Sequence, residues 1–324
     1  MTARASGVGS MPGSDYAEAV RMVLGELPDL PHLPELPARG AVASLVGRGA
    51  ALVADLGFDL QPAGWRLTDA PGVDHRRARS LLGQDLDVLE ELAQGHAGLL
   101  KLQVTGPWTL AATVEKPRGD KVISDHGARR ELAQALAEGV RAHLDDVRRR
   151  LPAATLVLQV DEPALPSVLG GQVPTASGFG RHRSVKPPEA AQALEWVLDA
   201  AGEAATLVHC CAADVPIRLL RQAGADGVSV DLAVLPASAY DDLATVLDEG
   251  GQVHLGVVPS TGATSPAVRS VVGSTSGLLD MLGLDPAEVA GQLVLTPACG
   301  LAAATPDYAL AALAACRDAA AEIG

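Results

Sequence analysis

Short apolar runs alternate with longer amphipathic stretches along the chain. Each of eight apolar runs ends in polar residues or in Gly or Pro, as buried strands of a parallel sheet do. The runs end at 7–10, 58–61, 102–105, 156–161, 207–209, 228–231, 254–258 and 293–296, and helical periodicity is clearest over 124–150, 188–201, 238–249 and 305–323. Strand followed by helix, repeated eight times, predicts an α/β protein with a single (β/α)8 TIM barrel over residues 1–324.

The alternative architecture is an open, doubly wound sheet. In its dinucleotide-binding form, three spaced glycines follow the first strand. Gly7 and Gly9 follow the first apolar run here, but the third glycine of the pattern is missing. No linker rich in Ser and Gly divides the chain, so the pattern favours the single barrel.

Charge and hydropathy indicate which kinds of molecule the protein can bind. The chain carries 39 acidic and 25 basic residues, a formal net charge of −14, which repels nucleic acid and anionic membranes on average. It has no secretory leader pattern and no apolar run of about 18 residues. Its four cysteines are too few for a disulfide scaffold. We therefore expect a cytoplasmic protein with reduced thiols and a small-molecule partner.

Polar residues gather where the predicted strands end, whereas the strand bodies are apolar. Barrel enzymes build their active sites at this carboxyl face. We therefore predict an active site among these residues. They are Ser10, Gln61, Asp161, Glu162, His209, Cys210, Cys211, Asp231 and Cys299.

One subset has the chemistry of a metal site. His209 and Cys211 are two residues apart, so in a strand both face one side and Cys210 faces the other. Cys299 follows the last apolar run, and Asp231 follows the sixth. One imidazole, two thiolates and a carboxylate form the tetrahedral set that Zn²⁺ prefers. Because zinc deprotonates a bound thiol, the prediction is a zinc enzyme for thiol alkylation.

Two other interpretations of the cysteines remain open. Free cysteines are often buried as small core residues. A structural zinc site is the other alternative, but such sites usually pair their ligands in Cys-x-x-Cys knuckles, and this sequence has none.

The remaining strand-end residues suggest a site for an amino-acid substrate. Alternation turns only one of Asp161 and Glu162 inward, where its carboxylate can hold an ammonium group, unless the acid instead caps a helix. Gly9 and Ser10 offer backbone N–H groups and a hydroxyl to a substrate carboxylate, although a plain tight turn explains them equally well. Gln61 is predicted to line the same pocket.

These motifs together resemble the catalytic carboxyl-terminal barrel of the cobalamin-independent methionine synthases, which are related to uroporphyrinogen decarboxylase-like barrels. The matching pieces follow the family's order over almost the whole chain. They are Gly7-Val8-Gly9-Ser10-Met11-Pro12, Val104-Thr105-Gly106-Pro107, Gln159-Val160-Asp161-Glu162-Pro163-Ala164-Leu165, His209-x-Cys211, Val228-Ser229-Val230-Asp231 and Pro297-x-Cys299-Gly300-Leu301.

The resemblance implies a specific activity. It implies zinc at His209, Cys211 and Cys299, with homocysteine contacted by Ser10 and Asp161 and methylated to methionine. The family's zinc glutamate aligns with Asp231, the histidine after the seventh strand is absent, and no counterpart of the family's amino-terminal half, which helps to bind polyglutamylated folate, precedes the barrel. Three functions therefore stay open: methyl transfer from methyl-tetrahydrofolate or a corrinoid, thiol binding without turnover, and decarboxylase-like chemistry.

Overall fold

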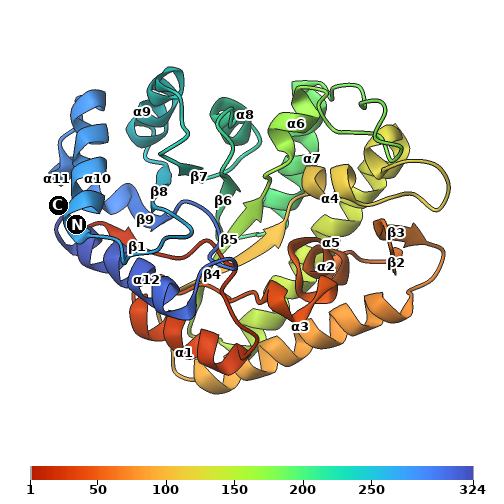
Figure 1. The fold of residues 1–324 in the computed structure, drawn as a ribbon, viewed down its shortest axis with the longest axis horizontal. Coiled ribbons are helices and arrows are strands. Elements are labelled where there is room, and N and C mark those ends of the chain that lie inside the picture. Colours follow the sequence, from red (N-terminus) through yellow and green to blue (C-terminus); the bar gives the residue numbers. More distant parts are fainter. Residues whose placement is uncertain (1, 324) are drawn as a thin grey trace.

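The computed structural model describes residues 2–323 and is built around one curled parallel sheet (Figure 1). Its seven strands lie in the order β1-β9-β8-β7-β6-β5-β4, and every neighbouring pair is parallel. They are β1 (Arg4–Ala5), β4 (Leu99–Thr105), β5 (Thr155–Asp161), β6 (Ala205–Cys210), β7 (Gly227–Asp231), β8 (Gln252–Val258) and β9 (Leu293–Pro297). The α/β class and seven of the eight predicted strand regions are confirmed.

The second predicted strand is not part of this sheet. Its residues form β2 (Gly57–Gln61), which pairs antiparallel with β3 (Gly64–Thr68) in a separate hairpin. Phe58 is buried, whereas Asp59 is half-buried and forms an ion pair with Arg66 across the hairpin at 2.7 Å. This alternation of apolar and polar residues is typical of a strand with one solvated face. The prediction of a barrel strand at 58–61 was therefore wrong.

Segment 31–35 lies instead between the β1 and β4 edges of the sheet. It exchanges two backbone hydrogen bonds with Lys101 of β4, both 2.9 Å long. On its other side it bonds to Gly9 and Met11, over 3.1 and 2.8 Å. Pro31 and Pro34 have no N–H to donate, so the segment makes isolated bridges and no continuous ladder.

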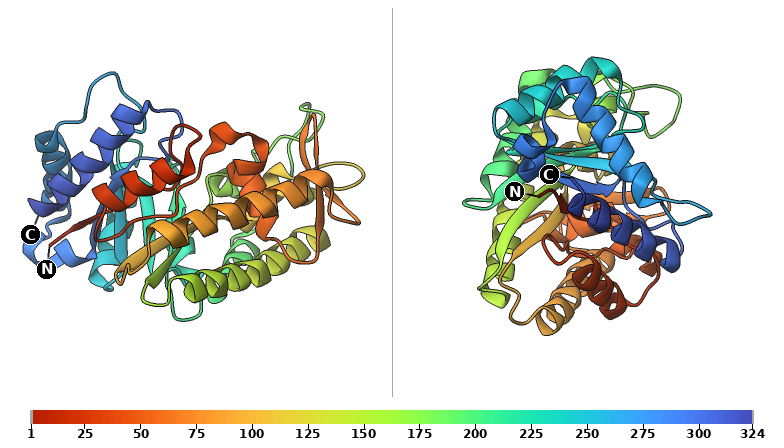
Figure 2. Two further views of the ribbon diagram at one scale, coloured as in Figure 1. Left: turned by 90° about the horizontal axis from the view of Figure 1, so that it is seen from below. Right: turned by 90° about the vertical axis from the view of Figure 1, so that its left-hand side faces the viewer.

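Helices cover the convex side of the sheet (Figures 1 and 2). Helix α1 lies beside α12, so the first and last helices of the chain are neighbours. Among residues 2–323, no helix combines the length and apolar composition that a membrane crossing needs. The helices are α1 (Tyr16–Glu26), α2 (Leu45–Leu52), α3 (Val73–Leu92), α4 (Pro107–Thr113), α5 (His126–Arg150), α6 (Leu165–Leu169), α7 (Pro187–Asp199), α8 (Ile217–Gln222), α9 (Tyr240–Asp248), α10 (Val268–Leu282), α11 (Pro286–Val289) and α12 (Pro306–Ala321).

Local sequence explains how these helices start and pack. The longest, α5, begins where the Asp125 side chain accepts a 3.0 Å bond from the Ala128 N–H, a typical N-cap. Within α5, Gly139 allows close contact with α2, because a Cβ atom there would meet the Leu52 carbonyl oxygen at 1.7 Å. The four helical stretches predicted most clearly correspond to α5, α7, α9 and α12.

The two faces of the sheet pack against different apolar clusters. The main apolar core lies between the strands and the helices and contains, among others, Leu158 and Val160 of β5. A second, small apolar cluster contains Leu30, Val157 and Leu207. Since residues two apart in a strand share a face, Val157 lies on the same side of β5 as Asp161 at the strand's carboxyl end. The concave side is thus apolar at one end and polar at the other.

Candidate metal centre

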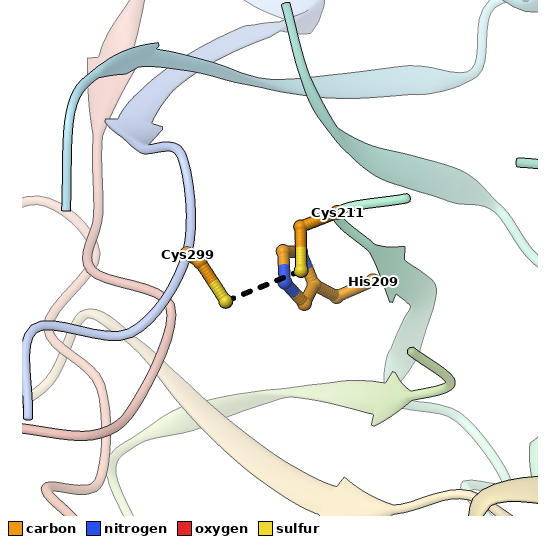
Figure 3. A group of neighbouring side chains, drawn as sticks. All are labelled: His209, Cys211 and Cys299. Carbon is orange, nitrogen blue, oxygen red and sulfur yellow. Dashed lines mark hydrogen bonds between the residues drawn. The ribbon is translucent and has the colours of Figure 1, made fainter. Parts of the chain in front are cut away.

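Three potential metal donors meet at the carboxyl ends of two strands. His209 belongs to β6, Cys211 follows it directly, and Cys299 lies in the loop after β9. Their donor atoms all lie within 4.8 Å of one another, and the two sulfur atoms are 3.2 Å apart (Figure 3). Cys210 is fully buried in the main apolar core, on the opposite side. The alternation predicted for these residues is therefore found.

The His209 ring has one satisfied and one unsatisfied nitrogen. Its Nδ1 is 2.8 Å from the Ser229 hydroxyl oxygen on β7. Its Nε2 is buried and has no hydrogen-bond partner. If Nδ1–H donates to Ser229, the Nε2 lone pair is free to ligate, the arrangement usual for metal-bound histidines. Because a buried unpaired nitrogen is costly, this atom favours a bound cation.

The two thiols interact strongly with each other. A hydrogen bond from the Cys211 thiol, together with the nearby His209, lowers the pKa of Cys299 to about 4 against the raising effect of burial, so Cys299 is the thiolate of the pair. Tetrahedral zinc with Zn–S bonds of about 2.3 Å separates two sulfurs by about 3.8 Å, roughly half an ångström more than here. Small side-chain rotations would provide this, so the group fits zinc.

A small cavity of about 140 Å³ adjoins the donor group. Gly9, Ser10 and Asp161, all predicted to bind substrate, line it together with the three donors. The Ser10 loop packs closely on the Cys299 loop, since a Cβ atom at Gly300 would lie 1.9 Å from the Ser10 hydroxyl oxygen. Two loops far apart in sequence thus form one wall.

Asp161 is almost fully buried in this cavity. One of its carboxylate oxygens accepts a 2.7 Å bond from the Gln159 amide. Burial raises the pKa of Asp161 to about 7, against the lowering effect of His209. A bound ammonium group would stabilise the ionised carboxylate.

Lys101 and Gln159 lie deeper on the concave side than Asp161. The Lys101 ammonium group donates to the Val8 carbonyl at 3.1 Å and to the Gln159 side-chain oxygen. The Gln159 amide therefore links Lys101 to Asp161 and orients the carboxylate.

Glu162 lies outside the cavity, which corrects its placement beside Asp161 among the substrate-binding residues. Its carboxylate accepts bonds from the backbone N–H groups of Trp108 and Thr109, both 2.8 Å, and from the Thr109 hydroxyl at 2.7 Å. These donors lie in the first turn of α4. Glu162 therefore accepts the free N–H groups at the start of α4. This is the helix-capping role given above as the alternative to binding a substrate ammonium group.

Two further predicted residues are not brought to the donor group. Gln61 lies in the β2–β3 hairpin, where its amide donates to Asp59 at 2.8 Å, so the expectation that it lines the pocket is corrected. Asp231 ends β7, but its carboxylate accepts the Ala233 N–H at 2.9 Å and faces a neighbouring cavity. The turn after β7 thus occupies the side chain that was expected to be the fourth ligand.

Sequence reasoning missed two residues of this region. Ser229 lies two residues before Asp231, so strand alternation could have placed it inward beside His209. Glu35 lines the cavity and forms a buried ion pair with Arg48 at 3.2 Å. It lies in a proline-rich stretch whose pattern predicts no strand, so no local signal indicated it.

The fold and donor group define an α/β protein with nitrogen and sulfur donors at its strand ends that could hold a metal ion. A family described as the catalytic domain of the cobalamin-independent synthases matches residues 92–322, and the chain belongs to this family. The predicted family is thereby confirmed, and with it a methyltransferase enzyme. A corrinoid methyl donor gains no support from a cobalamin-independent family.

One solved structure supports the same fold. The chain is similar to a B12-independent methionine synthase from Shewanella sp. W3-18-1 in complex with selenomethionine, with a TM-score of 0.66, 14% identity, and coverage of 99% of this chain and 97% of that one. A β-galactosidase from Marinomonas ef1 matches with a TM-score of 0.45, 12% identity, and coverage of 96% and 59%. No curated protein sequence matches the chain.

Proposed function

We propose that this chain transfers a methyl group to the thiol of homocysteine, with zinc held by His209, Cys211 and Cys299. The observation that carries the proposal is the buried, unpaired Nε2 of His209 facing two thiols within 4.8 Å. Three protein donors leave a fourth tetrahedral position open, as catalytic zinc sites do. Zinc bound there would hold the substrate sulfur as a thiolate, the form that attacks a methyl group.

The residues beside the donors suit the rest of an amino-acid substrate. The Asp161 carboxylate binds the substrate ammonium group, and its bond from Gln159 keeps it oriented. The Ser10 hydroxyl and the backbone at Gly9 and Ser10 bind the substrate carboxylate. In support, all three residues line the same cavity as the metal donors.

The donor that fits best is 5-methyltetrahydrofolate. In the transfer, the substrate sulfur forms a bond to the methyl carbon, the bond from that carbon to the folate nitrogen breaks, and the nitrogen takes up a proton. Membership of a cobalamin-independent family supports this donor over a corrinoid.

We also propose that residues 1–324 form one domain whose sheet closes into an eight-stranded barrel. Segment 31–35 would be the eighth strand, in place of the region predicted at 58–61. Its hydrogen bonds to both β4 and the chain after β1 support this closure.

The test is an assay of zinc-loaded protein with homocysteine and methyl-tetrahydrofolate, read out as methionine, alongside the zinc content. Cys299→Ala should lose both zinc and activity. Cys316→Ala removes a cysteine buried in α12, away from the donors, and should keep both. Full activity without zinc would refute the proposal, and homocysteine binding without turnover would favour a thiol-binding protein.

A further inference from the structure

A second groove lies outside the metal pocket, among the outer helices. It consists of two cavities of about 330 and 560 Å³, which share His126, Arg129 and Glu189 and are therefore continuous. Residues at the start of α5, in α7 and in the long loop between α6 and α7 line it. Figure 1 shows where these elements lie in the fold. None of its lining residues lines the metal pocket. Its volume is typical of a site for a small ligand.

The groove is cationic although the chain as a whole is acidic. With the histidines neutral, its lining carries five basic side chains and one carboxylate, 5 − 1 = +4, against −14 for the whole chain. Arg129 is neutralised by Glu189 at 2.8 Å. Within residues 2–323, the exposed Arg181, Arg183 and Lys186 have no ion-pair partner. Such clustered, unpaired charges attract an anion that carries more than one charge.

The other end of the groove is aromatic. The chain has three tryptophans, and two of them, Trp108 and Trp196, line the smaller cavity. The Trp108 indole N–H donates to the Ala190 carbonyl at 2.9 Å, which fixes that ring. The Arg130 guanidinium lies 5.9 Å from the centre of the Trp196 ring. An arginine stacked near an indole is a surface on which a flat ring can bind.

The loop that carries the cations is held in a defined shape. The Asp120 carboxylate accepts bonds from the Ala176 N–H at 2.8 Å and from the His182 ring at 3.1 Å. Arg181 pairs with Pro174 across the loop, and Phe179 at its tip is 99% exposed. Since the loop is already ordered, a ligand would pay little conformational entropy to bind there.

We propose that this groove binds a ligand with a flat aromatic ring system and at least two negative charges. The ring would lie against Trp196 and Arg130, and the anionic groups would reach Arg181, Arg183 and Lys186. Nucleoside triphosphates have this chemistry. The inference does not depend on methyl transfer at the metal centre.

Calorimetry with matched probes tests the proposal. Adenosine triphosphate is compared with inorganic triphosphate, each at low and high salt. We expect adenosine triphosphate to bind about tenfold more tightly than inorganic triphosphate, because stacking on an aromatic side chain contributes about 1–3 kcal/mol. Its affinity should fall as salt rises.

A charge-reversal variant locates the site. Arg181→Glu combined with Arg183→Glu should weaken binding at least about tenfold, since charge-assisted contacts are lost and repulsion is added. Arg21→Glu, an exposed position on α1, is the matched control and should change binding less than about twofold. If adenosine triphosphate does not bind, if inorganic triphosphate binds equally well, or if the double variant binds like wild type, the proposal fails. Loss of methionine formation alone would leave it standing.

Discussion

The two faces of the curled sheet belong to the same strands but carry different chemistry. On β5, Leu158 and Val160 join the apolar core under the helices, whereas Gln159 and Asp161 face the concave side. The outer face needs only apolar residues of suitable volume. The inner face needs particular donors and acceptors in particular places, because its buried polar groups must be satisfied. One face therefore specifies the fold, and the other specifies the chemistry.

Substitutions of the adjacent residues Cys210 and Cys211 test the difference between the two faces, and their expected effect is the largest. Cys211→Ala should lose the zinc and at least about a thousandfold of kcat/KM, because a metal contributes several kcal/mol to catalysis. Cys210→Ala should keep zinc and activity and cost about 1 kcal/mol of stability through lost packing. Metal analysis, steady-state kinetics and urea unfolding measure these effects. Equal loss of zinc in both variants would refute the assignment of faces.

The next largest effect is a loss of stability from a substitution on the outer face. Leu158→Ala should lower the free energy of unfolding by about 2–5 kcal/mol, because it leaves a cavity in the main core. Leu310→Ala, at a 42% exposed position in α12, should change it by less than about 0.5 kcal/mol. Urea unfolding of the zinc-free protein measures both. Comparable values would mean that the outer core is loosely packed.

His143 in the helix layer should affect stability but not chemistry. Burial, assisted by the Arg48 guanidinium, lowers the pKa of His143 to about 4 from 6.5. Since the folded pKa is the lower one, its contribution to stability is present above pH 6.5 and is lost as the pH falls towards 4. The loss should reach about 3 kcal/mol. His143→Gln should remove this part of the pH dependence, and identical pH profiles in the two proteins would contradict it.

The smallest effect concerns a residue that touches the donors only through another side chain. Ser229→Ala removes the hydroxyl that orients the His209 ring, so zinc affinity should fall about 10–100-fold. Ser80→Ala, exposed on α3, is the control and should bind zinc like wild type. Competition with a chromophoric chelator measures both affinities. An unchanged affinity in Ser229→Ala would mean that packing alone orients the ring.

The sequence was sufficient for the strands that are mainly apolar and for the donors placed by alternation. Buried parallel strands such as β5 and β6 are recognisable because both of their faces exclude water. His209 and Cys211 followed from the two-residue period of a strand.

The missed segment 31–35 and the wrong prediction for residues 58–61 have a common physical cause. Segment 31–35 contacts the sheet through residues that are distant in sequence, and its prolines hide it from any strand pattern. Residues 58–61 alternate apolar and polar side chains as a strand does, so the sequence predicts them in the barrel and Gln61 in the pocket. Asp231 ends β7, and its side chain bonds to its own turn, a local contact that strand alternation does not indicate.

The prolines of segment 31–35 also affect how readily this part of the molecule opens locally. Only the amides of Leu33 and Glu35 tie the segment to its neighbours as donors, one to each side. A segment held by four such backbone hydrogen bonds, two on each side, can open without unfolding the adjacent strands. Hydrogen exchange at Leu33 and Glu35 should therefore be faster than in β4 and should report local opening of the wall that carries Glu35. We therefore expect this wall of the pocket to open locally while the rest of the sheet stays folded.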